Sequence, residues 1–302
     1  MASSNGADEA ALERSYSVAP PVDVVTAEAL LREAKQIMDP LGVVFFLRQG
    51  TCLGAVRDKC IIPWDDDLDL GSIIGLHELT ERSINTVVAA FRNNGYFTKV
   101  EHNDHYINVA MMKSSTRTDW CCYRIIDDSI FHYPGVRVPV RLFTQLKEID
   151  FISEKFLVPN PPEEYLRCKY GAAWMTPKKT GFEKDILEMI PDVPLPGRGG
   201  RLRRFLGKHI LQGRAGRLKV LDHERKPVHG AEVRIAGVGR SRTNKQGYTK
   251  FYLPCDDWYA LVINYDNHEE VLYQEKMTPG RTYVYRPDSL AVSGRLCALS
   301  PE

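Results

Sequence analysis

The sequence of 302 residues is long enough to form one large domain or two ordinary domains, each with its own core. Hydrophobic residues make up 43% of the chain and charged residues 26%, which is the composition of a folded globular protein rather than a disordered one. The formal net charge of +1 excludes a general attraction to nucleic acid or to an anionic membrane, so any anion must bind locally.

The cysteines and the apolar stretches bear on the cellular compartment. The seven cysteines are an odd number and include no CxxC pair, so neither a disulfide framework nor a zinc site is supported. Reduced thiols of this kind are typical of cytoplasmic proteins. No apolar run approaches the roughly 18 residues of a membrane span, and Met1–Ser17 lacks the pattern of a signal peptide. We expect a cytoplasmic protein without a stable membrane anchor.

The amino-terminal part is expected to consist of a tail, a helix and a buried strand. Residues 1–21 are rich in Ser, Ala, Pro and charge, which predicts a mobile tail. Apolar residues recur at helical spacing over Ala27–Met38, and Thr26 stands where a helix N-cap would be. The apolar run Val43–Leu47 predicts a strand.

Two small residues follow this strand. Gly50 and Thr51 come directly after it, and Arg57 lies a short distance downstream. A small residue lets backbone N–H groups approach a phosphate, and a helix that begins there would present its positive end. We therefore expect Gly50, Thr51 and Arg57 to bind a phosphate group of a substrate.

Four carboxylates lie within five positions, at Asp65, Asp66, Asp67 and Asp69. In an extended segment Asp65, Asp67 and Asp69 would project to one face and Asp66 to the other. Carboxylates this close repel one another, and Mg²⁺ or Mn²⁺ would relieve the repulsion; Mg²⁺ is usually held by one or two carboxylates together with substrate phosphates. A solvated acidic turn is the competing interpretation from charge alone.

Further elements are expected up to residue 177. They are a helix over His77–Asn94, strands over Tyr96–Glu101, Tyr106–Met112, Trp120–Tyr133 and Val136–Val140, and, after the segments Phe143–Phe151 and Lys155–Val158, a helix over Glu163–Tyr170. The first two of these strands would form a hairpin on the sheet that carries the carboxylates.

Two separated blocks, in the same order, resemble the LicD and fukutin-type family of phosphotransferases. The first block is Leu47–Arg57 with Ile62–Asp69, and the second is Phe143–Phe151 with Pro162–Pro177. The resemblance covers roughly Val22 to Pro177, a little over half of the chain. It implies an α/β nucleotidyltransferase-like catalytic domain over residues 22–180, with a mixed sheet and flanking helices.

The resemblance also implies an activity. Members of this family move a phosphoalcohol, such as phosphocholine or ribitol phosphate, from a CDP-linked donor to a hydroxyl of a glycan, and CMP is released. By this resemblance Asp67 and Asp69, helped by Asp65, would be the catalytic carboxylates and would hold Mg²⁺. Lys169 and Tyr170, with Arg167 as a weaker candidate, would contact the nucleotide or the acceptor.

The third metal ligand is uncertain on sequence grounds. The family commonly has Asp where this chain has Asn108, whose amide oxygen can ligate a hard cation but brings no charge. Asp119, Asp127 and Asp128 are alternative ligands, and His105 is a lone histidine that could act as an acid or base.

Two other functions remain open at this point. One is nucleotidyl transfer, in which a nucleoside monophosphate is attached and pyrophosphate leaves. The other is a catalytically weak pseudoenzyme or glycan-binding protein, which Asn108 and an additional carboxyl-terminal module would favour.

The composition changes after residue 180. Residues 181–212 are rich in Pro and Arg, which predicts a linker with a short basic helix at Arg198–Arg204. Short strand patterns with turns over residues 213–290 predict a small antiparallel sandwich, and they resemble the carboxypeptidase-regulatory, transthyretin-like β-sandwich. We expect an accessory module that could support oligomer formation or glycan contact, followed by a tail at residues 291–302.

Overall fold

The computed structural model describes residues 2–196, 215–288 and 294–302. The chain divides into two compact units. The first contains Met1–Phe131 and Arg137–Thr176, and the second contains His132–Val136 and Pro177–Glu302. The basic helix expected at Arg198–Arg204 lies outside the described residues.

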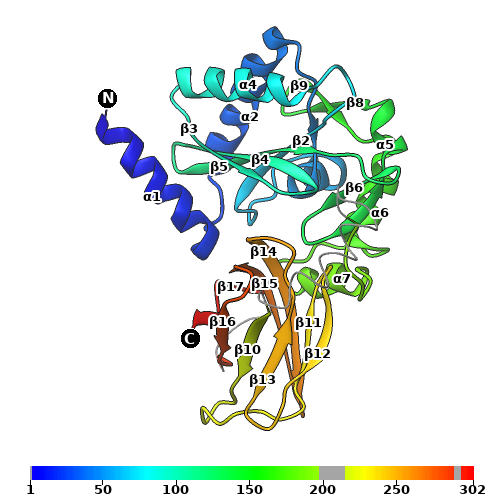
Figure 1. The fold of residues 1–302 in the computed structure, drawn as a ribbon. Helices are drawn as coiled ribbons and strands as arrows, with labels where there is room; N and C mark the ends of the chain where they lie inside the picture. The colour runs from blue at the N-terminus through cyan, green and yellow to red at the C-terminus, as the bar shows by residue number, and fades with distance from the viewer. Residues whose placement is uncertain (1, 197–214, 289–293) are drawn as a thin grey trace. The chain divides into compact units, whose positions relative to one another are not determined.

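A five-stranded mixed sheet forms the centre of the first unit (Figure 1). Its strands lie in the order β1-β2-β5-β4-β3, and only the β2–β5 pair is parallel. Their bounds are β1 Phe46–Leu47, β2 Asp67–Ile73, β3 Phe97–His102, β4 Tyr106–Lys113 and β5 Thr116–Tyr123. This arrangement confirms the predicted α/β domain with a mixed sheet, including the β3–β4 hairpin.

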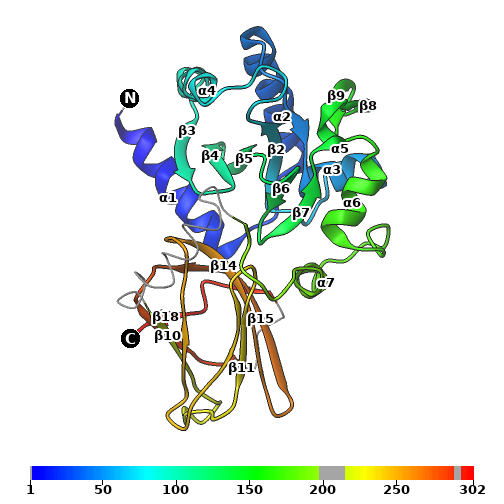
Figure 2. The same ribbon diagram turned by 45° about the vertical axis from the view of Figure 1, so that its right-hand side comes forward.

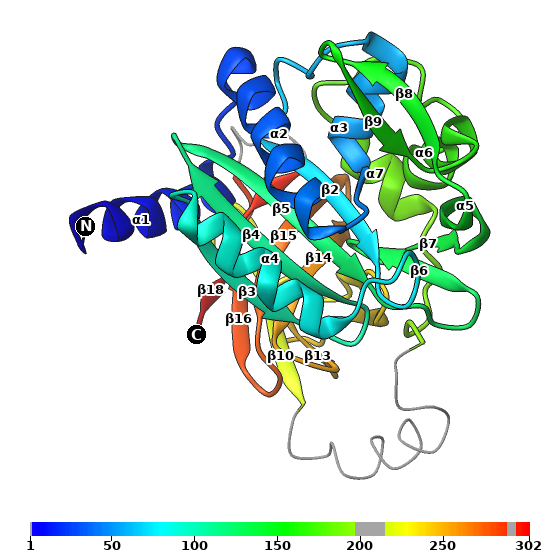
Figure 3. The same ribbon diagram turned by 90° about the horizontal axis from the view of Figure 1, so that it is seen from above.

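Two amphipathic helices, α2 Val24–Met38 and α4 Glu81–Asn93, lie together on one side of this sheet (Figure 3). Each buries its apolar stripe, as the helical spacing predicts. The N-cap of α2 is Asp23 rather than Thr26, because the Asp23 carboxylate accepts the backbone N–H of Thr26 at 2.8 Å. The helix therefore begins earlier than predicted.

Residues expected to form a mobile tail contain helix α1, Ala2–Val18. Leu12, Ser15 and Tyr16 on one face of this helix are buried, and α1 packs against β3 and β4. Leu12 and Tyr16 are spaced i, i+4, so they lie on the same helix face. The polar composition of this segment did not reveal the short apolar helix face that packs against the sheet.

Shorter elements complete the first unit. They are the 3-10 helix η1 Asp39–Leu41, α3 Gln49–Leu53, the π-helical turn η2 Gly54–Asp58, β6 Ser129–His132, β7 Val136–Pro139, α5 Arg141–Thr144, β8 Lys147–Phe151, β9 Glu154–Val158 and α6 Pro162–Tyr170. The strand predicted over Trp120–Tyr133 is interrupted, because Asp127 and Asp128 both adopt positive φ angles in a turn between β5 and β6.

The described residues of the second unit form strands and one helix, α7 Phe182–Glu188, which occupies part of the expected linker (Figure 2). Its sheets have the orders β13-β10-β16-β18 and β12-β11-β14-β15-β17. The strands are β10 Gly216–Val220, β11 Glu232–Ile235, β12 Gly239–Arg242, β13 Tyr248–Phe251, β14 Asp257–Tyr265, β15 His268–Met277, β16 Thr282–Tyr285, β17 Arg295–Leu296 and β18 Ser300–Pro301.

Strands of both sheets contribute to one apolar core, which includes Leu218, Val233 and Leu261. An all-β carboxyl-terminal region is thereby confirmed. The sheets are mixed rather than purely antiparallel, since β10 pairs with β16 and β15 pairs with β17 in parallel. Residues 294–302, expected to be a tail, carry β17 and β18. The transthyretin-like identity of this region stays a prediction.

Within the described ranges, the helices are too short or too polar to span a lipid bilayer.

The packing of α1 leads to a stability prediction. Substitution of Leu12, whose side chain is fully buried, by Ala should lower the free energy of unfolding by about 2 to 5 kcal/mol through loss of apolar contact and cavity formation. Urea unfolding measures this loss. Glu9→Ala, at an exposed position of the same helix, should change stability little. Equal and small effects of the two substitutions would mean that α1 does not pack on the sheet.

Candidate metal and phosphate site

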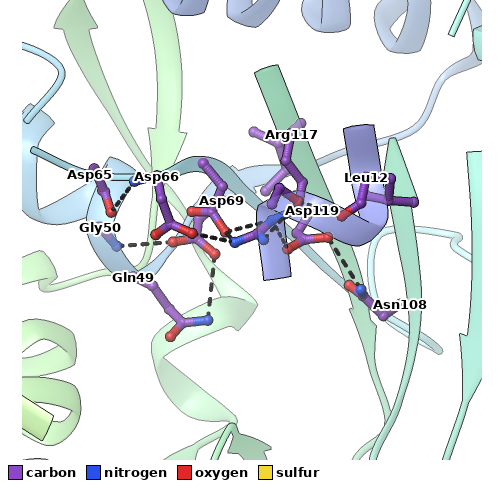
Figure 4. A network of polar contacts seen from close by, with 12 residues as sticks. Leu12, Gln49, Gly50, Asp65, Asp66, Asp69, Asn108, Arg117 and Asp119 are labelled. Carbon is purple, nitrogen blue, oxygen red and sulfur yellow. Dashed lines mark hydrogen bonds and ion pairs between the residues drawn. The ribbon is translucent and has the colours of Figure 1, made fainter. Parts of the chain in front are cut away.

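Adjacent parallel strands place four charged side chains on one face of the sheet. Asp67 and Asp69 lie on β2, and Arg117 and Asp119 lie opposite them on β5, in the pairs Asp67–Arg117 and Asp69–Asp119. Residues two apart on a strand share a face, so all four side chains project from the same side. Figure 4 shows Asp69, Arg117 and Asp119 converging there.

The carboxylates of Asp65, Asp66 and Asp67 form a compact group in which one oxygen of each lies within 4.8 Å of the others. The expectation that Asp66 projects away from its neighbours is therefore wrong. The alternation of a strand applies only from Asp67, where β2 begins, and the preceding turn lets Asp66 join the group. Asp65 accepts a hydrogen bond from the backbone N–H of Asp66.

Gly50 and Thr51 form hydrogen bonds with Asp69 of the acidic strand β2. The backbone N–H of Gly50 donates to Asp69 Oδ2 at 3.1 Å, and the Thr51 hydroxyl accepts the backbone N–H of Asp69 at 2.8 Å. A Cβ atom on Gly50 would lie 2.0 Å from Asp65 Oδ2, so any larger residue here would force the Asp65 carboxylate to move. In this structure the polar groups of Gly50 and Thr51 bind Asp69, and their predicted contact with a phosphate stays a prediction.

Two buried arginines neutralise part of the acidic group. Arg48 forms an ion pair with Asp69 Oδ1 at 2.9 Å and donates to the Leu70 carbonyl oxygen at 2.8 Å. Arg117 forms ion pairs with Asp66, Asp67 and Asp119. The sequence interpretation missed both residues. Their positions in the sequence could have indicated that they lie in the site. Arg48 is two residues before Gly50, and Arg117 is two residues before Asp119 on the same strand.

The site keeps an excess of negative charge. When fully ionised, its five carboxylates, Asp65, Asp66, Asp67, Asp69 and Asp119, exceed the two guanidinium charges of Arg48 and Arg117 by three. Burial and then repulsion from Asp67 raise the pKa of Asp66 to about 6. Burial also raises the pKa of Asp69 to about 7, although Arg48 opposes the shift. Hard oxygen donors with this charge suit a divalent cation such as Mg²⁺.

Helix α6 brings Lys169 beside the acidic strand. The Tyr165 hydroxyl accepts the backbone N–H of Gln49 at 2.9 Å, which joins α6 to the first turn of helix α3, called here the Gly50 turn. Lys169 is fully buried, and burial lowers the pKa of its amine to about 7 while the charge of Asp69 acts in the opposite direction. The structure thus places Lys169 near Asp69, and the predicted substrate contacts of Lys169, Tyr170 and Arg167 stay predictions.

Asn108 is positioned by Asp119 rather than by the β2 carboxylates. Its amide Nδ2 donates to Asp119 Oδ1 at 3.3 Å from the neighbouring strand β4. Asp119 therefore supplies the carboxylate on the adjacent strand, and Asn108 serves as its hydrogen-bond partner. This geometry favours Asp119, rather than Asn108, as the third metal ligand.

Other predicted residues have different surroundings. The Arg57 guanidinium is ion-paired with Asp58 and donates to the Trp174 carbonyl oxygen at 3.4 Å, so its proposed phosphate contact stays a prediction. Asp127 and Asp128 lie in the turn before β6, where Asp128 pairs with the exposed Arg137. The His105 ring lies 5.2 Å from the Phe131 ring, centroid to centroid, and its role as an acid or base stays a prediction.

The contact of Gly50 with Asp65 can be tested by a double-mutant cycle. Gly50→Ala should displace the Asp65 carboxylate and weaken Mg²⁺ binding roughly 10- to 100-fold, as measured by calorimetry. The same substitution in an Asp65→Ala background should cause little further loss, because the overlapping group is gone. A loss of equal size in both backgrounds would show that Gly50 acts independently of Asp65.

Raised carboxyl pKa values make stability depend on pH. Because the pKa of Asp69 is about 7 in the fold against 3.8 ordinarily, the folded protein binds more protons than the unfolded chain between these values. The metal-free protein should therefore lose stability as pH rises from 5 to 7.5, on the order of 1 kcal/mol or more.

Mg²⁺ should compensate for this loss, since it replaces the protons. Its effect on Tm should be larger at pH 7.5 than at pH 5.5, with NaCl of equal ionic strength as the control. Equal Mg²⁺ effects at the two pH values would contradict the linkage between protons and the cation.

The segment that carries the site is similar to a known family of domains. Residues 42–161 match the model described as LicD/FKTN/FKRP, nucleotidyltransferase domain. This range contains the Gly50 turn, the acidic segment and both strands that carry charged side chains, β2 and β5.

Individual relatives agree with this match. The uncharacterized protein RT0683 of Rickettsia typhi is 30% identical over 130 residues, which are 43% of this chain and 36% of that protein. The ribitol-5-phosphate transferase FKTN of Homo sapiens is 28% identical over 167 residues, or 51% of this chain and 34% of that protein. The chain thus spans about a third of the length of these relatives. The similarity of this chain to the LicD/FKTN/FKRP nucleotidyltransferase domain therefore lies in residues 42–161, the segment that carries the acidic group.

Proposed function

We propose that this chain transfers a phosphoalcohol from a CDP-linked donor to a hydroxyl of a glycan or related acceptor, with release of CMP. The observation that carries the proposal is the acidic group of Asp65, Asp66 and Asp67, packed against Gly50 within the LicD/FKTN/FKRP domain. The distant similarity to a protein named ribitol-5-phosphate transferase supports the same reaction class.

A divalent cation, Mg²⁺ or Mn²⁺, fits the residues present. The donors are carboxylate oxygens, the ligand type that these cations prefer, and they carry uncompensated negative charge. Asp65 and Asp67 would hold the cation, with Asp66 and Asp69 beside them. The cation would neutralise charge on the diphosphate of the donor.

The side chains of the protein would position the reactants. Arg48 and the Gly50 N–H fix the Asp69 carboxylate, so the acidic strand keeps its geometry when a substrate enters. Lys169 would add positive charge near the transferred phosphoryl group. One carboxylate of the acidic group would accept the proton of the attacking hydroxyl.

The same proposal covers the partners of the protein. The nearly neutral net charge favours a small nucleotide donor and a glycan acceptor over nucleic acid. A cytoplasmic location and oligomer formation through the carboxyl-terminal all-β region are further proposals, the first from the cysteine content and the second from the additional module.

The activity can be tested with a panel of CDP-alcohols, including CDP-choline and CDP-ribitol, and a panel of glycan acceptors. Mg²⁺-dependent CMP release, with a matching mass increase of one acceptor, is the expected result. Asp67→Asn and Asp69→Asn should each lower turnover by roughly 100-fold or more, since they remove charge at the reacting phosphate. The control Asp150→Asn alters an exposed carboxylate and should leave turnover unchanged.

Other products would identify the competing functions. Pyrophosphate release from CTP, with a nucleotide attached to the acceptor, would indicate nucleotidyl transfer instead. Absence of any product, together with Mg²⁺-independent glycan binding in calorimetry, would indicate a binding protein. Full activity of both Asn variants would refute the catalytic role of the acidic strand.

A further inference from the structure

Arg117 lies at the centre of three carboxylates. Its Nη2 atom lies 2.7 Å from Asp66 Oδ2 and 2.6 Å from Asp67 Oδ2, and its Nε atom lies 3.2 Å from Asp119 Oδ2 (Figure 4). The side chain is only 6% exposed. A guanidinium keeps its charge at all physiological pH values, and its planar fork matches the geometry of carboxylates. Arg117 is thus a permanent positive charge inside the acidic group.

Helix α1 holds this guanidinium from the other side. Nη1 of Arg117 donates to the Ser15 hydroxyl at 3.1 Å, and the Arg117 guanidinium carbon lies 4.8 Å from the centre of the Tyr16 ring. Both α1 residues are buried. The Ser15 hydrogen bond and the Tyr16 ring restrain the Arg117 side chain. Moving this side chain away would break several contacts at once and leave the carboxylates without their positive partner.

The contacts of Arg117 leave one region of the acidic group for a metal ion. Two-metal phosphoryl-transfer sites hold cations about 3.5 to 4 Å apart, and the two cations share carboxylates. Here Oδ2 atoms of Asp66, Asp67 and Asp119 are already bound to Arg117. The Asp65 carboxylate lies on the Gly50 side of the group and has no ion pair among the described residues.

We propose that Arg117 takes the place of a second metal ion, so that the site binds one divalent cation, on the side of Asp65. The guanidinium supplies a fixed positive charge between β2 and β5. The bound cation supplies a second positive charge, which can enter and leave with the nucleotide donor. The inference rests on the proposed function only in requiring a cation site. Its test needs no donor or acceptor, so it can fail while the transfer activity is found.

The test is the number of Mn²⁺ ions bound per chain, measured by titration with Mn²⁺ alone and detection of free Mn²⁺ by electron paramagnetic resonance. The wild-type protein should bind one ion. Arg117→Met removes the charge at similar length and should bind two, because Asp66, Asp67 and Asp119 become available. Arg117→Lys keeps a charge and should bind one, as should Arg137→Met, which removes an exposed arginine that pairs with Asp128.

The results separate the alternatives. A wild-type count of two, or of none, would overturn the proposal without any variant, even if Arg117→Met does not fold. One ion in a folded Arg117→Met protein would overturn it too, whatever its affinity. If that ion were bound more tightly than in the wild type, it would occupy the position of the Arg117 guanidinium. Circular dichroism of each variant establishes folding.

Discussion

The electrostatic balance of the acidic segment is the constraint on which the rest of the first unit depends. Asp65 to Asp69 cannot be packed beside the sheet unless positive charge is placed among them, because burial and mutual repulsion both oppose ionisation. Arg48, directly after β1, and Arg117, on β5, supply that charge. Both arginines are buried and depend on surrounding groups, so the elements around the sheet also serve to hold these two side chains.

Three elements distant in sequence meet this requirement. Helix α1 binds Arg117 through Ser15, the Gly50 turn binds Asp69, and α6 binds the same turn through Tyr165. Such fully connected polar networks determine one geometry, because loss of any partner leaves a buried charge unpaired. Preorganised charge of this kind is what phosphoryl transfer requires of a protein, since positioning and neutralisation do most of the catalytic work.

The sequence predicted much of this fold because its local patterns are strong. Helical spacing located α2 and α4, and the acidic motif located the site through Asp67 and Asp69. It could not predict that Arg117 enters the site, because this depends on the parallel pairing of β2 with β5, a contact between distant residues. The role of Asp119 relative to Asn108 followed from the same pairing. The packing of α1 depends on an apolar helix face of only a few residues, which the composition of the segment does not reveal. The direction of the Asp66 side chain depends on the residue at which β2 begins.

Whether one cation binds at the acidic group while Arg117 stays in place can be seen by diffraction from crystals that contain Mn²⁺ and CDP. Anomalous scattering locates the ion without reference to activity. The account predicts one peak, in contact with carboxylate oxygens of the Asp65–Asp67 group, with the Arg117 guanidinium still bound to Asp67 and Asp119. A peak at the position of a displaced Arg117 side chain, or no peak among these carboxylates, would contradict it.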